Sequence, residues 1–226
     1  MKNKTSILIE ILVLVVGIAI VGTTAIKAKS KERTALLFPP KDLKYFTLGF
    51  SETAADILWL RDIQDFELCG AATEVSSDSA AKCLKGWSYR MLDTIVELAP
   101  RFKMPYISGG TVLSIIARDH EGAASIFKRG VERFPDDWQM AYRAGFHFMD
   151  AMKDNQMASD YLLLAAKKGA PGWVFALAAR LKTKLGQAIY AKSILEEVIK
   201  TDPESRWAKR LQQRLDEIEE VIRKGE

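Results

Sequence analysis

Histidine and cysteine are scarce in this chain, which has only two of each among its 226 residues. A structural zinc site needs four such ligands held close together, and two cysteines without neighbouring histidines cannot supply them. The sequence also contains no HExxH pair, no phosphate-binding glycine loop and no serine elbow. We therefore expect no metal, no cofactor and no catalytic residue, and we predict that the chain is not an enzyme.

A long block of like charge is absent as well. The 33 basic and 29 acidic residues are mixed along the chain, and the formal net charge is only +4. This distribution does not suit a surface that follows a phosphate backbone, so we predict no nucleic-acid partner. Basic residues gather only behind the first apolar segment, where they are typical of a membrane-flanking collar. They are Lys27, Lys29, Lys31 and Arg33.

The chain begins with an apolar run from Ile7 to Ile26, which is interrupted only by Glu10. About 20 such residues suffice for one helix to cross a bilayer. Two lysines precede the run, so it also resembles a secretory signal with a weak cleavage site at Thr23 and Ala25. The run is longer than a signal core of about 7–15 residues. We predict an uncleaved transmembrane anchor over residues 1–26, with residues 7–26 in the membrane.

The two cysteines, Cys69 and Cys83, flank a small and polar stretch from Gly70 to Lys82. We predict a loop closed by a Cys69–Cys83 disulfide, which would contribute about 3 kcal/mol and would persist in an oxidising compartment. This places the folded part in the periplasm, tethered by a single pass to a bacterial inner membrane. Two unrelated buried thiols are the alternative. The basic collar behind the span favours the opposite orientation, because positive charge tends to stay inside.

Residues 27–50 read as the collar and a stiff linker around Pro39–Pro40, and residues 51–226 read as helix. Apolar residues recur there at three- and four-residue spacing, without the alternation of a strand. A longer period is also present: Trp138 and Trp173 lie 35 positions apart, as do Pro100 and Pro135. Helix–turn–helix repeats have a period of about 34 residues.

In this spacing the chain resembles the tetratricopeptide repeat family, which has small, bulky and proline residues at set positions. The second unit carries Gly110, Ala123, Phe127, Gly130 and Pro135. The third carries Gly145, Ala158, Leu162 and Ala165, with Ala170 in the proline position and Pro171 beside it. Leu92 and Pro100 represent the first, and Ala178, Ile194 and Pro203 the fourth. The resemblance implies an all-α, right-handed superhelical array of about four hairpins. A closing helix over residues 203–224 has an apolar stripe and is predicted to cap the array.

Packing explains the pattern of the repeat. Small residues let two helices approach, bulky residues fill the gap to the next hairpin, and proline ends the second helix. The stretch from Leu48 to Phe66 also resembles, loosely, the first helix of anchored bacterial envelope proteins, some from gliding-motility or surface-assembly gene clusters. In that helix we expect Trp59 and Leu60 to enter the core of the first hairpin and Asp56 and Arg61 to make local polar contacts. Direct contact of these residues with a partner is the alternative.

The resemblance further implies a concave inner surface, lined by the first helix of each hairpin, that binds other envelope proteins. An amphipathic helix or extended peptide would dock on it. Alternatively, several of these residues belong to the core, or the chain's own Phe38–Phe50 segment covers them. The groove lacks the Lys/Asn clamp that family members use for a terminal carboxylate. The expected groove residues are Ile107, Thr111, Gln139, Tyr142, Phe146, Met149, Phe175 and Lys182.

Together these features predict a membrane-tethered scaffold or adaptor in a cell-envelope complex for motility, secretion or surface assembly. Two alternatives remain open at this stage. One is an accessory subunit of a cell-wall or envelope enzyme, and the other is a membrane subunit that packs laterally through its span.

Overall fold

The computed structural model describes residues 11–19, 36–71 and 86–225, and the chain divides into two units, Met1–Leu37 and Phe38–Glu226. In the first unit residues 11–19 are helical. Across the described ranges, no helix combines the length and the apolar character that a membrane crossing requires. Residues 1–10 and 20–35 lie outside the described ranges. The anchor predicted over residues 7–26 therefore stays a prediction.

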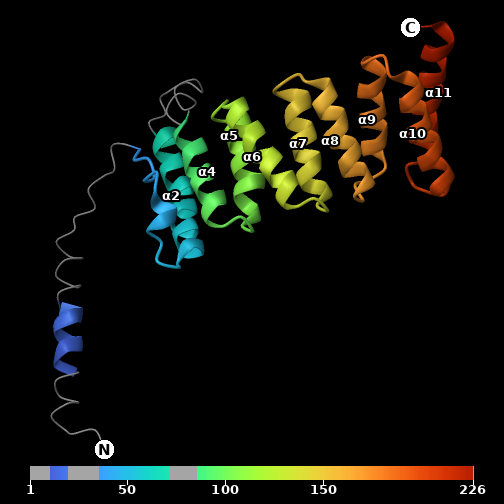
Figure 1. The fold of residues 1–226 in the computed structure, drawn as a ribbon. Helices are drawn as coiled ribbons and strands as arrows, with labels where there is room; N and C mark the ends of the chain where they lie inside the picture. Colours follow the sequence, from blue (N-terminus) through green and yellow to red (C-terminus); the bar gives the residue numbers. More distant parts are fainter. Residues whose placement is uncertain (1–10, 20–35, 72–85, 226) are drawn as a thin grey trace, which may run out of the picture. The chain divides into compact units, whose positions relative to one another are not determined.

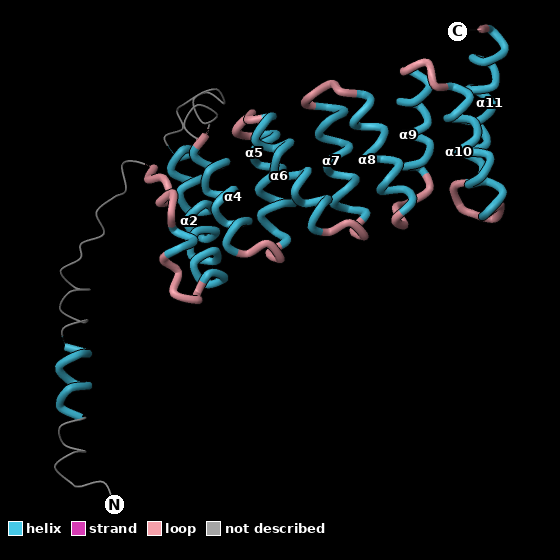
Figure 2. Tube along the Cα trace, viewed as in Figure 1, coloured by secondary structure: helices cyan, strands magenta, loops and turns pink. Residues whose placement is uncertain are grey.

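The second unit is built of helices, with no strand in its described part, and consecutive helices lie side by side in chain order (Figure 1). Short loops join most of them (Figure 2). The predicted all-α class is confirmed. The helices are α2 (Ser51–Ala71), α4 (Trp87–Leu98), a π-helical turn η2 (Pro105–Gly109) that runs into α5 (Gly110–Ile115), α6 (His120–Arg133), α7 (Trp138–Asp150), α8 (Asn155–Lys167), α9 (Trp173–Lys184), α10 (Ala188–Thr201) and α11 (Ala208–Lys224).

These helices pair as four hairpins, α2 with α4, η2–α5 with α6, α7 with α8 and α9 with α10. The pairing matches the four units expected from the 35-residue period. In three hairpins the second helix ends two residues before the repeat proline, at Leu98, Arg133 and Thr201. Proline excludes the helical conformation from the residue before it, so its position sets the end of the helix.

The glycines of the repeat pattern permit close contact between the two helices of a hairpin. A Cβ atom on Gly110 would lie 2.9 Å from the ring of Phe127, and one on Gly145 would lie 2.8 Å from Cγ of Leu162. The ring of Phe127 also lies 5.4 Å from the ring of His147 in the next hairpin. The bulky residue of the second repeat, Phe127, thus packs within its own hairpin as well as toward the next one.

Helix α11 closes the array as predicted. Its buried residues Leu211, Leu215 and Ile218 pack with α9 and α10. Its other face carries charged residues, as expected of a terminal helix that meets solvent.

Three aspartates that the sequence analysis did not single out begin helices in the middle of the array. The carboxylates of Asp119, Asp137 and Asp154 accept backbone N–H groups at the first turns of α6, α7 and α8. Each satisfies donors that the helix itself leaves without partners. A single aspartate before an apolar helix is the sequence signal that identifies them.

Helix α2 differs from its prediction. Trp59 is half-buried and meets Phe102 edge-on at 5.9 Å, but the side chain of Leu60 is 58% exposed. The expectation that Leu60 enters the core is therefore wrong. The face that packs on α4 carries Asp62 and Asp65, which are both buried. Arg61 pairs with Asp65 at 3.1 Å, which confirms a local polar contact for Arg61.

The predicted disulfide falls outside what the structure describes. Cys69 lies within α2 without a described side chain, and residues 72–85, which include Cys83, are not described. The bridge stays a prediction. The part of the expected linker from Phe38 onward belongs to the second compact unit of the chain. There the helical turn η1 (Leu43–Tyr45) packs against α4, and Lys44 pairs with Glu97 at 3.5 Å.

Candidate functional site

A cavity of about 470 Å³ opens along the first helices of three consecutive hairpins, α5, α7 and the start of α9. We call it the aromatic groove, because four of its side chains are tryptophan, tyrosine or phenylalanine from α7 and α9. Its lining residues are Thr111, Ser114, Ile115, Phe127, Trp138, Gln139, Tyr142, Arg143, Phe146, His147, Asp150 and Trp173.

Helix α7 forms one wall of the aromatic groove. Trp138, Tyr142 and Phe146 follow each other at four-residue spacing, which places them on one face of the helix. The ring of Tyr142 lies 6.5 Å from that of Trp138, 6.4 Å from that of Phe146 and 5.6 Å, edge-on, from that of Trp173. Phe146 remains 44% exposed. The wall is therefore a preformed row of aromatic rings with an open end.

The floor of the groove is polar and neutral. His147 is buried, and its Nε2 lies 3.1 Å from the carbonyl oxygen of His120. A carbonyl only accepts, so Nε2 carries the hydrogen, and in the neutral ring Nδ1 accepts the hydroxyl hydrogen of Ser114 at 2.8 Å. Burial lowers the pKa of His147 below its usual value of 6.5. The Ser114 oxygen keeps its acceptor capacity for a ligand.

The rim of the groove carries one charge of each sign, Arg143 and Asp150. Asp150 lies 3.7 Å from Lys153, and both of these side chains are largely exposed. Arg143 is exposed and has no ion pair within the described residues. A ligand segment with mixed charge would find a counterpart on each side of the aromatic wall.

Half of the groove residues expected from the sequence meet at this cavity. They are Thr111, Gln139, Tyr142 and Phe146. The remaining lining residues include Trp138 and Trp173, which were noted for their period but not assigned to the groove. The helical spacing from Trp138 to Tyr142 could have identified the first of them.

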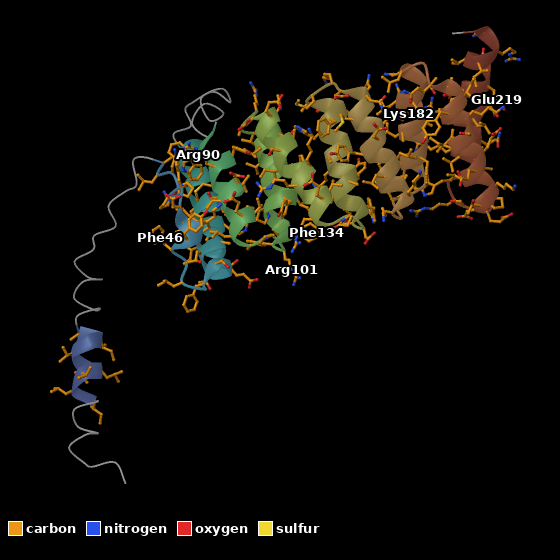
Figure 3. All side chains as sticks on the ribbon, viewed as in Figure 1. Phe46, Arg90, Arg101, Phe134, Lys182 and Glu219 are labelled. Carbon is orange, nitrogen blue, oxygen red and sulfur yellow. The ribbon has the colours of Figure 1, made fainter. Side chains whose placement is uncertain are left out.

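The other four expected residues lie elsewhere. Ile107 is half-buried in η2, and Met149 packs against the core shared by α7, α8 and α9. Phe175 faces a second cavity of about 490 Å³ beside α10. Lys182, on α9, is labelled in Figure 3. It is only 4% exposed and donates to Asp160 at 2.6 Å. Met149 and Phe175 pack against buried core clusters and Lys182 is paired with Asp160 in the interior, in line with the alternative interpretation for these three.

Catalysis has little geometric support in the groove. The Ser114–His147 pair is held by a backbone carbonyl, whereas an activated serine usually has its histidine oriented by a carboxylate. Within the described ranges, no three His, Cys, Asp or Glu side chains are grouped as metal ligands.

No protein-family model matches the chain, and no curated protein matches it. It is similar to the solved structure of YrrB, described as a TPR protein with an unusual peptide-binding site, with 17% identity and a TM-score of 0.42 over 61% of this chain and 68% of YrrB. It is also similar to MamA from Desulfovibrio magneticus RS-1, with 16% identity and a TM-score of 0.41 over 73% of this chain and 93% of MamA.

Proposed function

We propose that this chain is a scaffold or adaptor that binds a segment of a partner protein in the aromatic groove. The observation that carries the proposal is the row of Trp138, Tyr142 and Phe146, closed by Trp173, along a cavity of about 470 Å³. Preformed aromatic walls of this kind contribute most of the binding free energy in many interfaces, because they bury large area at low entropic cost.

The dimensions of the groove favour a protein segment that inserts one or two large apolar side chains. The wall is apolar, while the floor offers the Ser114 oxygen as an acceptor and the rim offers Arg143 and Asp150. An amphipathic helix or extended peptide combines these chemistries, with an apolar anchor flanked by polar and charged groups.

Co-purification of the full chain from mild detergent tests the proposal. Phe146→Ala removes an exposed aromatic wall residue and should lower the recovery of the bound partner about tenfold or more. Tyr190→Ala is a matched control, because Tyr190 is 46% exposed against 44% for Phe146 and does not line the aromatic groove. A wild-type chain that purifies alone, or equal recovery with both variants, would contradict the proposal.

We further propose that the chain is tethered to the bacterial inner membrane through residues 7–26, with its hairpins in the periplasm as part of an envelope complex. The apolar run and the spacing of Cys69 and Cys83 support this placement. In cells both thiols should resist alkylation until a reductant is added. Free labelling without reductant would refute the periplasmic placement. The identity of the partner would separate a motility, secretion or surface-assembly adaptor from an accessory subunit of an envelope enzyme.

A further inference from the structure

Large apolar side chains are exposed together on the first hairpin, at the end of the array that begins the second unit. We call this surface the N-terminal edge. It comprises Tyr45 (73% exposed), Phe46 (73%), Leu48 (88%) and Phe50 (69%) before α2, and Ile57 (61%), Leu60 (58%) and Ile63 (48%) on α2. Figure 3 shows Phe46 beside the start of the array. Exposed apolar patches of this extent mark a surface that contacts something else.

Helix α2 does not separate its polar and apolar residues as a solvated helix does. Its buried residues are Ala55, Leu58, Asp62 and Asp65, whereas its exposed residues include Ile57, Leu60 and Ile63 beside Glu52 and Asp56. A terminal helix that met only water would turn its charges outward. The folding of the hairpin alone does not account for the outward aliphatic residues.

The segment before α2 is folded, so its apolar side chains are held outward by an ordered backbone. The N–H of Phe46 donates to the Leu43 carbonyl at 3.0 Å, and that of Phe50 donates to the Thr47 carbonyl at 2.8 Å. Leu48 has a φ of +49°. This left-handed conformation is uncommon for residues other than glycine, and it costs free energy. A leucine held in this conformation with 88% of its surface exposed gains nothing from its own domain.

The opposite end of the array is finished differently. Helix α11 buries its aliphatic stripe and carries its charges on the remaining surface. Its Glu219 pairs with Lys192 of α10 at 2.7 Å, and its Lys224 pairs with Glu220 at 2.8 Å. Helices α2 and α11 lie at the two ends of the row (Figure 1). The last helix thus buries its aliphatic stripe, whereas the first helix leaves three large aliphatic side chains exposed.

The apolar end is also the end nearest in sequence to the predicted membrane span. Phe38 follows Ile26 by twelve residues, a stretch that reaches at most about 40 Å when fully extended. A bilayer that held the span would therefore lie within reach of the N-terminal edge. Aromatic rings with aliphatic neighbours are favoured in the interfacial layer of a membrane.

We propose that the N-terminal edge docks on the lipid surface, with Phe46, Leu48 and Phe50 inserted into the interfacial layer and the outer face of α2 lying against it. A protruding tip such as Leu48 needs no complementary pocket in lipid, whereas a second copy of the chain would have to supply one. The docking adds a second membrane contact to the proposed tether, on which it partly rests, and it leaves the aromatic groove free.

Photo-crosslinking of the full chain in vesicles of phosphatidylethanolamine and phosphatidylglycerol tests the docking. The photoreactive residue p-benzoylphenylalanine takes the place of Phe46 in one protein and of Ile189, which is 77% exposed, in the control. Yields of lipid adduct, measured by mass spectrometry on vesicle-bound chain, should be several-fold higher at position 46. Equal yields, or chain–chain adducts in place of lipid adducts, would overturn the docking alone. A chain that does not sediment with vesicles would overturn the tether and the docking together.

A second comparison guards against a local effect of the probe. With the probe in place of Leu60, the pair Phe46→Ser and Leu48→Ser should lower the lipid adduct several-fold. The pair Ile189→Ser and Tyr190→Ser, which alters exposed apolar residues on α10, should leave it unchanged. A loss of adduct with both pairs, or with neither, would count against the docking.

Discussion

Gly145 of α7 lies directly against Leu162 of α8, so closely that a Cβ atom on the glycine would come within 2.8 Å of Leu162 Cγ and 3.1 Å of the Leu162 backbone nitrogen. The two helices of the third hairpin therefore meet at a point where no side chain fits. Because one of the obstructing atoms is backbone, the contact cannot be relieved by a change of rotamer alone.

Gly145→Ala should destabilise the chain by about 1–3 kcal/mol, as expected when a well-packed interface is overfilled. Urea unfolding followed by circular dichroism measures the loss. Leu162→Ala removes the side-chain part of the obstacle, so Gly145→Ala should cost less in that background than in the wild type. Strictly additive losses would show that the two residues do not interact as described.

Asp160→Ala should destabilise the array because it leaves the buried ammonium of Lys182 without its carboxylate partner at 2.6 Å. We expect a loss of about 1–3 kcal/mol in the free energy of unfolding. Lys182→Met removes the charge and keeps an apolar stem, and should cost less. Asp150→Ala is the control, since its pair with Lys153 is exposed and should contribute about 0.5 kcal/mol or less. A larger cost for Lys182→Met than for Asp160→Ala would refute this account.

Asp62 should make the chain less stable as pH rises from about 4 to about 7. Burial, with a smaller contribution from the nearby Asp65 carboxylate, raises the pKa of Asp62 to about 7 despite the opposing hydrogen bond from Ser88. Between the unfolded and folded pKa values the unfolded state has lost a proton that the folded state keeps, so folding becomes less favourable with increasing pH. Denaturation curves at pH 5 and pH 8 should show the difference.

Asp62→Asn keeps an acceptor for Ser88 and removes the titration. It should unfold at higher urea than the wild type at pH 8 and at similar urea at pH 5. Asp56→Asn, on the exposed face of the same helix, should leave the pH dependence unchanged. A stability difference between the wild type and Asp62→Asn that did not widen from pH 5 to pH 8 would contradict the raised pKa of Asp62.

His147 should titrate below 6.5 in NMR spectra of the folded chain, because burial disfavours its charged form and lowers its pKa. The contribution of His147 to stability should therefore decrease as pH falls below 6.5, where the unfolded histidine takes up a proton that the folded one resists. Ser114→Ala should cost about 1 kcal/mol by removing the donor to Nδ1. Ser193→Ala, at an exposed hydroxyl, should cost less. A His147 pKa above 6.5 would refute the buried neutral ring.

The helical pairing was predictable because it depends on local signals. Prolines end the second helices, and glycines recur where helices must touch, so the positions of Pro100, Pro135, Gly110 and Gly145 suffice to outline the hairpins. The groove was predictable only in part. Repeat positions identify four of its residues, Thr111, Gln139, Tyr142 and Phe146. The same positions also selected Lys182, but this side chain is turned into the interior by its hydrogen bond to Asp160, which lies 22 residues earlier in another hairpin.

The row of α-helical hairpins and the closing helix follow from the amino-acid sequence alone, because apolar periodicity and prolines act over a few residues. Only the tertiary structure decided which side chains meet in the aromatic groove and which face of α2 turns outward. The buried Asp62 and the exposed Leu60 lie two residues apart in one helix whose polar and apolar residues are both spread around its circumference, so its pattern does not distinguish the inner face from the outer. Contact with α4 makes that distinction, because it buries one face and leaves the other free.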